Sequence, residues 1–214
     1  MAATPEKLAE IRRKLAKDFP SAQRAFGRAL AVGVPSIDRA SGGLPLGAVT
    51  EFVCGAPSCG SHLLIGELLA ATRAHRIRTA LVDAADCFDP CSFPPDLLVH
   101  LVWVRCTAAT ALPAADLLAR DANLGLVILD LGYAAEAELR RTPSTAWYRL
   151  QRAVEPAELA LVVLTPRPSV PSAQLRFVLD KSHAAAALTA ERPALAAALA
   201  PVLQRQRLQA NLAG

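Results

Sequence analysis

Four strand-like runs separated by helical stretches constrain the fold of this chain more than any other feature. The runs are rich in β-branched and large apolar residues, and they cover residues 48–54, 78–83, 124–131 and 160–165. The helical stretches between them cover residues 63–73, 113–120 and 146–154. Strands that alternate with helices predict βαβ units. We therefore expect an α/β fold with a largely parallel central sheet flanked by helices.

The length of 214 residues suits one core of ordinary size, which we place at residues 33–190. Two weaker strand candidates in this core lie at residues 98–104 and 175–179. Residues 1–32 are expected to hold an N-terminal amphipathic helix and a linker. Residues 191–214 begin rich in alanine and leucine and then become basic, so we expect a C-terminal helical, basic tail.

The N-terminal helix has one narrow apolar stripe surrounded by charged residues, because apolar residues recur at spacings of three and four. A single amphipathic helix of this length is only marginally stable by itself, so it must pack against something. Two arrangements stay open: the helix packs on its own core, or it contacts a partner protein. The candidate partner contacts are Leu8, Ile11, Leu15, Arg12, Arg13 and Phe26.

A glycine-bounded loop at residues 55–60 follows the first strand and precedes the first core helix. In the Walker A pattern G-x-x-x-x-G-K-[ST], backbone N–H groups surround the phosphates, the lysine neutralises them and the hydroxyl holds Mg²⁺. Gly55 and Gly60 match this pattern, but Ser61 replaces the lysine and His62 replaces the hydroxyl residue. Charge-assisted contacts are the strong ones, so this loop keeps the shape of a phosphate site without its affinity.

Composition and charge exclude several classes of protein. No apolar run approaches the roughly 18 residues of a membrane span, and the charged N-terminus does not resemble a signal peptide. We therefore expect a cytoplasmic chain without membrane contact. Its cysteines should be reduced, and their spacing does not fit zinc ligands, so no metal is expected. An aromatic content of 5% argues against a base-stacking platform, while a formal charge of +4 permits weak DNA binding.

Three linked segments resemble the nucleotide site of the RecA family. Residues 42–62 resemble its phosphate-binding region, and residues 82–90 resemble its D-A-E-H-A-L-D-P stretch. Residues 126–130 resemble its Walker B strand. The segments occur in the family's order and spacing within residues 33–165. The resemblance implies a RecA-like core.

The positions carried over from the RecA family are degenerate. Ala85 stands where the family has the glutamate that activates the attacking water, which alanine cannot do. Asp130 keeps the Walker B carboxylate, but without a hydroxyl partner it is a poor Mg²⁺ ligand, and we expect a strand-end turn residue. Together with Ser61 and His62, these changes predict no catalysis and no cofactor. A residual ATPase stays open, because a cation from elsewhere, such as Lys181, could reach the loop.

Among degenerate RecA-like proteins, the chain is most similar to the ImuA family, which has a helical N-terminus and a basic C-terminal tail. The resemblance implies an accessory protein of the SOS response to DNA damage, acting in SOS mutagenesis and translesion synthesis, a form of DNA repair. Its implied partners are RecA, whose filament it would modulate, and an ImuB-like relative of Y-family polymerases. An error-prone DNA polymerase would take part indirectly. A SulA-like cell-division inhibitor, also RecA-like without nucleotide binding, is the alternative.

Arginines supply the candidate contacts with DNA. The RecA family has mobile DNA-binding loops after the Walker B strand, and the corresponding interval at residues 132–144 contains Arg140 and Arg141. In the C-terminal tail, Arg205 and Arg207 could contact DNA phosphate or the ImuB-like partner. A solvated helix face is the alternative for the tail arginines.

Overall fold

A seven-stranded, mostly parallel sheet forms the centre of the molecule. The computed structural model describes residues 28–207, and its main sheet has the strand order β5-β4-β6-β7-β3-β8-β9. The strands are β3 (Ala48–Val53), β4 (Thr79–Asp83), β5 (Leu101–Arg105), β6 (Leu126–Asp130), β7 (Ala160–Thr165), β8 (Leu175–Val178) and β9 (Val202–Gln206). Neighbouring strands are parallel except for the antiparallel pair β8 and β9. The predicted α/β fold with a largely parallel central sheet is confirmed.

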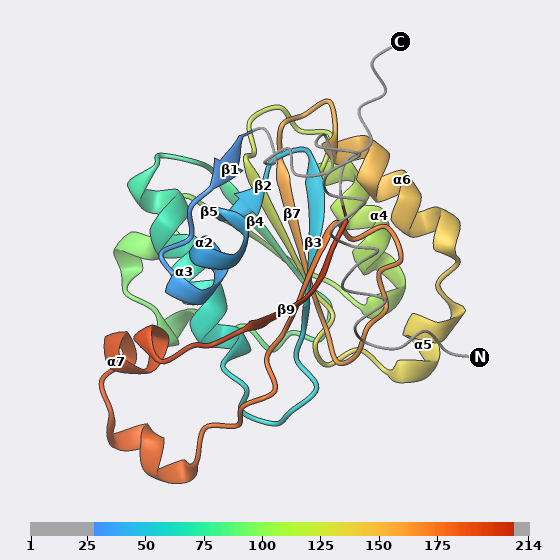
Figure 1. The fold of residues 1–214 in the computed structure, drawn as a ribbon. Helices are drawn as coiled ribbons and strands as arrows, with labels where there is room; N and C mark the ends of the chain where they lie inside the picture. The colour runs from blue at the N-terminus through green and yellow to red at the C-terminus, as the bar shows by residue number, and fades with distance from the viewer. Residues whose placement is uncertain (1–27, 208–214) are drawn as a thin grey trace, which may run out of the picture.

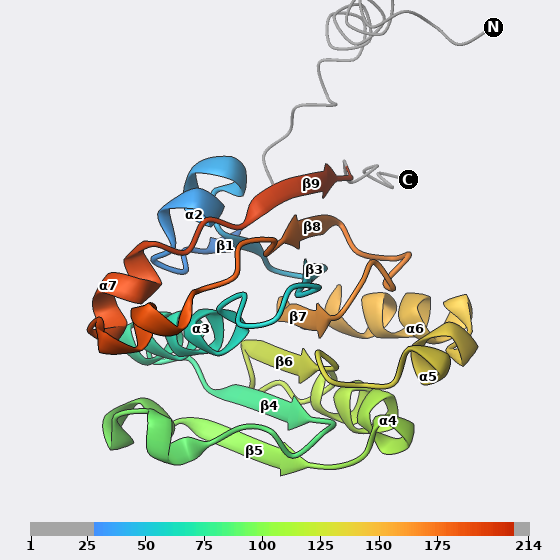
Figure 2. The same cartoon turned by 90° about the horizontal axis from the view of Figure 1, so that it is seen from below.

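Helices cover both faces of the sheet, as Figure 1 and Figure 2 show. One face carries α3 (Ser61–Ala74) with the shorter α2 (Pro35–Ser41) and α7 (Arg192–Ala197). The other face carries α4 (Ala108–Leu118), α5 (Glu136–Arg141) and α6 (Ser144–Val154). Short 3-10 turns lie at Pro90–Ser92, Pro95–Leu98 and Ala185–Thr189. Within residues 28–207, no helix combines the length and apolar character needed to cross a bilayer.

Each face of the sheet has its own apolar layer, which explains the long apolar runs in the sequence. Phe52 of β3 and Leu68 of α3 belong to one layer, where Phe52 stacks on Phe177 with ring centres 5.2 Å apart. Trp147 of α6 and Val127 of β6 belong to the other layer. Because strands such as β6 and β7 are buried on both faces, nearly all of their residues are apolar.

Helix α4 begins at Ala108, five residues before the predicted start at residue 113. The reason is a capping box, in which the backbone N–H of Thr107 donates to Oγ1 of Thr110 over 3.2 Å. Such a box satisfies donors that the first turn of a helix leaves unpaired. Pro113 consequently lies inside the helix instead of starting it.

The predicted helical tail at residues 191–214 is wrong for most of its described part. Only Arg192–Ala197 is α-helical, and Val202–Gln206 forms the edge strand β9 of the main sheet. Burial alternates along β9, with Leu203 packed against the core and its two neighbours exposed. That period of two suits an edge strand, and the basic composition of the segment concealed it.

A two-stranded sheet, β1 (Ala29–Leu30) with β2 (Leu44–Pro45), precedes β3 and depends on one glycine. Gly43 has a φ of +108°, and a Cβ atom there would lie 2.4 Å from the carbonyl oxygen of Leu30. No side chain fits at that distance, so the close approach of the two segments requires glycine.

Candidate functional site

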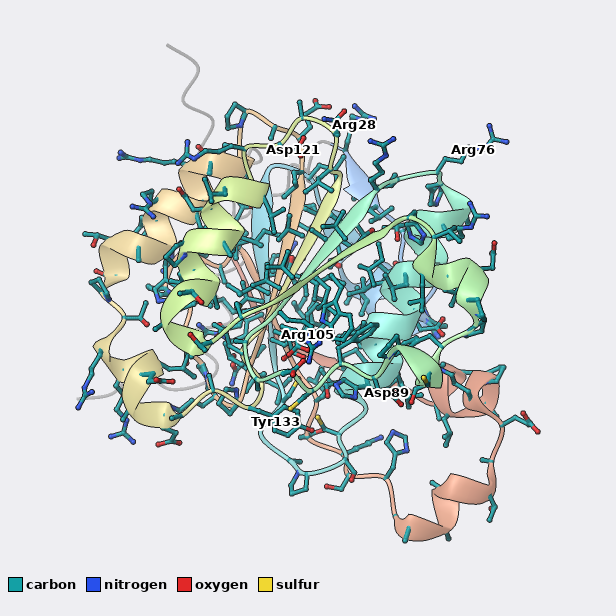
Figure 3. All side chains as sticks on the ribbon, turned by 180° about the vertical axis from the view of Figure 1, so that it is seen from behind. Arg28, Arg76, Asp89, Arg105, Asp121 and Tyr133 are labelled. Carbon is teal, nitrogen blue, oxygen red and sulfur yellow. The ribbon has the colours of Figure 1, made fainter. Side chains whose placement is uncertain are left out.

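The loop at residues 55–60 lines a cavity at the carboxyl ends of the parallel strands. It connects β3 to α3, and the cavity has a volume of about 840 Å³. Tyr133 and His183 line its other sides. Figure 3 shows Tyr133 at the same end of the molecule as Arg105, the last residue of β5, and Asp89, which follows β4. Ligands of parallel sheets bind at this end, so the structure places the loop where a ligand site is expected.

The surroundings of both loop glycines leave little room for a side chain. Gly60 precedes α3 with a φ of +89°, and its carbonyl accepts the N–H of Leu64 over 2.9 Å. A Cβ atom on Gly60 would lie 2.6 Å from Cδ2 of Leu199. A Cβ atom on Gly55 would lie 3.0 Å from the carbonyl oxygen of Pro166. Both positions therefore favour glycine, Gly60 because of its left-handed backbone and Gly55 because of its close approach to Pro166.

The charge that a phosphate requires is missing from the cavity wall. Ser61 and His62 are the first two residues of α3, and neither lysine nor arginine lines the cavity in the described part of the chain. Nε2 of His62 is buried and has no hydrogen-bond partner within residues 28–207. A nucleoside triphosphate carries several negative charges, which a cradle without a cation cannot neutralise. These residues do not fit that ligand.

Arg192 of α7 is a candidate cation for the loop, but its guanidinium is used in contacts within the fold. The guanidinium of Arg192 donates to the carbonyl of His62 over 2.9 Å and to the carbonyl of Ser92 over 3.1 Å. The same group stacks on Phe93, 4.3 Å from the ring centre. Arg192 therefore joins α7 to α3, and its charge is directed at backbone carbonyls instead of at the cavity.

The segment that resembles the family's catalytic stretch is held by a single carboxylate. Asp83 ends β4 and accepts the backbone N–H groups of Ala85, Cys87 and Phe88 over 3.3, 3.1 and 2.9 Å. It also accepts the indole N–H of Trp103 over 3.3 Å. Ala85 itself is exposed and presents only a methyl group, so the structure puts no general base at this position.

Asp130 ends β6 beside Asp83 and is only 6% exposed. Its Oδ1 accepts the N–H of Gly132 over 2.9 Å, which is the geometry of a strand-end turn. Burial raises the pKa of Asp130 above its ordinary value, although the bond from Gly132 opposes this rise. A raised pKa disfavours the ionised form that binds Mg²⁺, and no cluster of three or more metal-ligating side chains occurs in residues 28–207.

A buried ion pair between the adjacent strands β3 and β8 was not predicted. Glu51 lies in the middle of β3 with no exposed surface, and its Oε2 accepts Nε of Arg176 over 2.6 Å. Its Oε1 accepts the hydroxyl of Thr165 and the N–H groups of Ser169 and Val170 over 3.0, 2.6 and 3.0 Å. The carboxylate thus fixes the segment after β7 to the sheet. The sequence indicated this ion pair only through one glutamate within a mostly apolar strand, since a buried charge needs a partner.

The first candidate DNA-contact segment, residues 132–144, contains a short helix instead of an open loop. Arg140 and Arg141 form the last turn of α5. Arg140 pairs with Glu136 over 2.7 Å, and Arg167 pairs with the same carboxylate over 3.0 Å. Glu136 therefore offsets part of the positive charge, while Arg141 is exposed at the end of the helix.

Arg205 lies on the edge strand β9 and Arg207 directly follows it, so neither lies on a helix face. The guanidinium of Arg205 donates to the carbonyl of Pro171 over 3.2 Å, so it is partly used within the fold. Arg207 is exposed, and its backbone N–H donates to the carbonyl of Gln174 over 2.7 Å. The candidate partner contacts of the N-terminal helix lie outside the described residues: Leu8, Ile11, Leu15, Arg12, Arg13 and Phe26.

Comparison with known proteins adds no assignment. A scan against protein-family models finds no match. A search of curated proteins finds no significant match. The site must therefore be interpreted from its own geometry.

Proposed function

We propose that this chain is a non-catalytic, RecA-like accessory protein of damage-induced mutagenesis, similar to the ImuA family. It would bind RecA and modulate its filament, bind an ImuB-like polymerase relative, or do both during translesion DNA synthesis. The observation that carries the proposal is the loop at residues 55–60, which keeps the two glycines of the Walker A spacing while no lysine or arginine lines its cavity within residues 28–207. Such a scaffold supports binding of other macromolecules and not phosphoryl transfer.

The arrangement of the sheet supports the RecA-like part of the proposal. The three segments that resemble the RecA family are distant in the sequence but meet at one end of the sheet. Asp83 and Asp130 are paired residues on the adjacent strands β4 and β6, and the loop at residues 55–60 follows β3 at the same end. A seven-stranded, mostly parallel sheet flanked by helices is consistent with a RecA-like core.

Exposed groups around the cavity supply a surface for a macromolecular partner. Tyr133 lines the cavity and is 65% exposed, and exposed aromatic residues are frequent anchors of protein interfaces. Arg141, the last residue of α5, is exposed and is available for an acidic partner or for DNA phosphate. We assign contact with RecA to Tyr133, to Arg141 and to the N-terminal stripe that contains Leu8 and Ile11.

The proposal is tested by ATP turnover of RecA on single-stranded DNA while the full chain is titrated in. We expect turnover to fall with added chain, and the chain alone to release no phosphate. Tyr133→Ala should weaken the effect, with Tyr148→Ala as the matched control because Tyr148 is 46% exposed on α6. The double variant Leu8→Asp with Ile11→Asp tests the N-terminal stripe separately. If the chain releases no phosphate and RecA turns over ATP at an unchanged rate, RecA binding is contradicted. That result would favour a scaffold that binds only the ImuB-like protein, or the SulA-like division inhibitor.

One observation favours a residual ATPase as a second candidate. Lys181 lines a cavity of about 160 Å³ that Cys59 of the loop also lines, so a cation lies close to the degenerate phosphate cradle. If that lysine completed the site, the chain alone would release phosphate from ATP, and Lys181→Ala would abolish the activity. Absence of turnover in the unmodified chain removes this candidate.

A further inference from the structure

The cavity beside the loop at residues 55–60 has a largely apolar lining. The lining residues come from the loop, from the start of α3, from the segments after β6 and β7, and from residues 183–195. Within residues 28–207, no aspartate, glutamate, lysine or arginine is among them. The volume of about 840 Å³ lies within the roughly 300–1,000 Å³ of small-molecule sites in proteins. The cavity therefore has room for a small organic molecule but offers it no formal charge.

The charged groups that contact the lining residues are used within the fold. The guanidinium of Arg192 donates to the carbonyl of His62 and to a second carbonyl. The carboxylate of Asp130 is only 6% exposed and accepts the N–H of Gly132 over 2.9 Å. A charged ligand would therefore lose its hydration without gaining a counter-ion, which is costly. The dipole of α3 favours an anion at its first turn, but this effect is smaller than that cost.

Two histidines give the cavity wall hydrogen-bonding groups that need no charge. Both His62 and His183 are lining residues, and Nε2 of His62 is buried without a hydrogen-bond partner within residues 28–207. Nε2 of His183 lies beside the loop, 3.3 Å from where a Cβ atom on Gly60 would be. Buried polar atoms are seldom left unpaired, so His62 favours a ligand that brings it a hydrogen-bonding group. A neutral imidazole can donate to or accept from such a group, according to its tautomer.

An alanine-rich segment, residues 183–195, forms one wall of the cavity. Ala185 and Ala187 of its 3-10 turn and Leu195 of α7 are lining residues. The segment is attached to the loop, because the N–H of His183 donates to the carbonyl of Ser58 over 3.0 Å. Figure 1 shows that this segment and the loop extend from the same end of the molecule. Small alanine side chains leave the space between them open to a ligand.

We propose that this cavity binds an uncharged aromatic small molecule that carries one hydrogen-bonding group. The apolar lining would contact the ring, and His62 would bond to the polar group. Tyr133 is 65% exposed and also lines the cavity, which favours a flat aromatic ligand because aromatic rings pack well on one another. This inference goes beyond the proposed role with RecA and does not depend on it, since ligand binding and RecA turnover are measured separately.

The test compares three probes on one ring system by calorimetry of the full chain at about pH 8, where histidine is mostly neutral. Naphthamide is uncharged, naphthoate is an anion and naphthylmethylamine is a cation. We expect naphthamide to bind with a Kd below about 1 mM and at least about tenfold more tightly than either charged probe. Charged probes that bind as tightly as naphthamide would overturn the proposal, and so would a chain that binds no naphthamide up to about 1 mM.

Two adjacent alanines of the 3-10 turn supply a matched pair of variants. Ala185→Trp should weaken naphthamide binding at least about tenfold, because the indole takes up space in the cavity. Ala186→Trp is the control, since Ala186 is equally an exposed residue of this turn but is not among the lining residues.

The substitution His62→Leu should remove the preference for naphthamide over naphthalene, because the polar group of the probe then loses its partner. Unchanged binding in Ala185→Trp, or an equal loss in Ala186→Trp, would place the probe elsewhere and overturn the proposal. A retained preference in His62→Leu would overturn the part assigned to His62. The comparison of charged and uncharged probes uses the unaltered chain, so it decides the proposal even if a variant fails to fold.

Discussion

Replacing Glu51 should destabilise the chain more than any exposed substitution, because its carboxylate is fully buried and accepts four hydrogen bonds. Glu51→Leu leaves the guanidinium of Arg176, which is 14% exposed, without its counter-ion. It also leaves the N–H groups of Ser169 and Val170 without an acceptor. Removing one partner of a buried ion pair costs about 3–5 kcal/mol. That loss is a large fraction of the roughly 5–15 kcal/mol that stabilises a typical domain.

Urea unfolding followed by tryptophan fluorescence measures the loss, since Trp103 and Trp147 lie on opposite faces of the sheet. The double variant Glu51→Leu with Arg176→Leu separates the ion pair from the remaining hydrogen bonds. We expect it to lose less stability than the sum of the two single variants, by at least about 1 kcal/mol. A single-variant loss below about 1 kcal/mol, or additive losses in the double variant, would refute the reasoning.

Two further predictions concern Gly43 and Asp130. Gly43→Ala should cost about 1–3 kcal/mol more than Gly42→Ala in urea unfolding, because only the former meets a backbone oxygen. Equal losses of stability in the two variants would contradict this prediction, because they would mean that β1 and β2 move apart at little cost. Asp130→Asn should raise the free energy of unfolding at about pH 7. Burial raises the pKa of Asp130 in the folded chain, so ionising this carboxyl costs stability as the pH rises. The asparagine variant avoids that cost, and its advantage should therefore disappear towards about pH 4, where the carboxyl is protonated. An asparagine variant that is less stable at neutral pH than at acidic pH, relative to the unaltered chain, would contradict this sign.

The sequence predicted the fold class well because the central strands are buried on both faces. Runs such as β6 and β7 are apolar except for their last residues, which is the pattern of a strand buried on both faces. Edge strand β9 escaped prediction because it ends in Gln204, Arg205 and Gln206, a polar and basic composition that resembles a frayed helix. Helix α5 escaped because its six residues are too few to show a period.

The candidate site was predicted as a loop but not as a set of contacts. The glycine spacing located residues 55–60, because glycine positions depend on local backbone geometry. The contacts of Glu51 and Arg192 depend on partners distant in the sequence, such as the Arg176–Glu51 pair across two strands. Spacing within the sequence carries no information on such contacts.

Direct titration of the full chain with ATP and Mg²⁺ tests the central claim that the loop keeps the shape but not the chemistry of a nucleotide site. Calorimetry of the reduced chain measures the affinity, and a phosphate assay on the same sample measures turnover. We expect a Kd weaker than about 1 mM and no released phosphate, because the cavity wall offers the phosphates no cation. A Kd in the micromolar range, about 8 kcal/mol of binding free energy, or any turnover that Lys181→Ala removes, would contradict the claim.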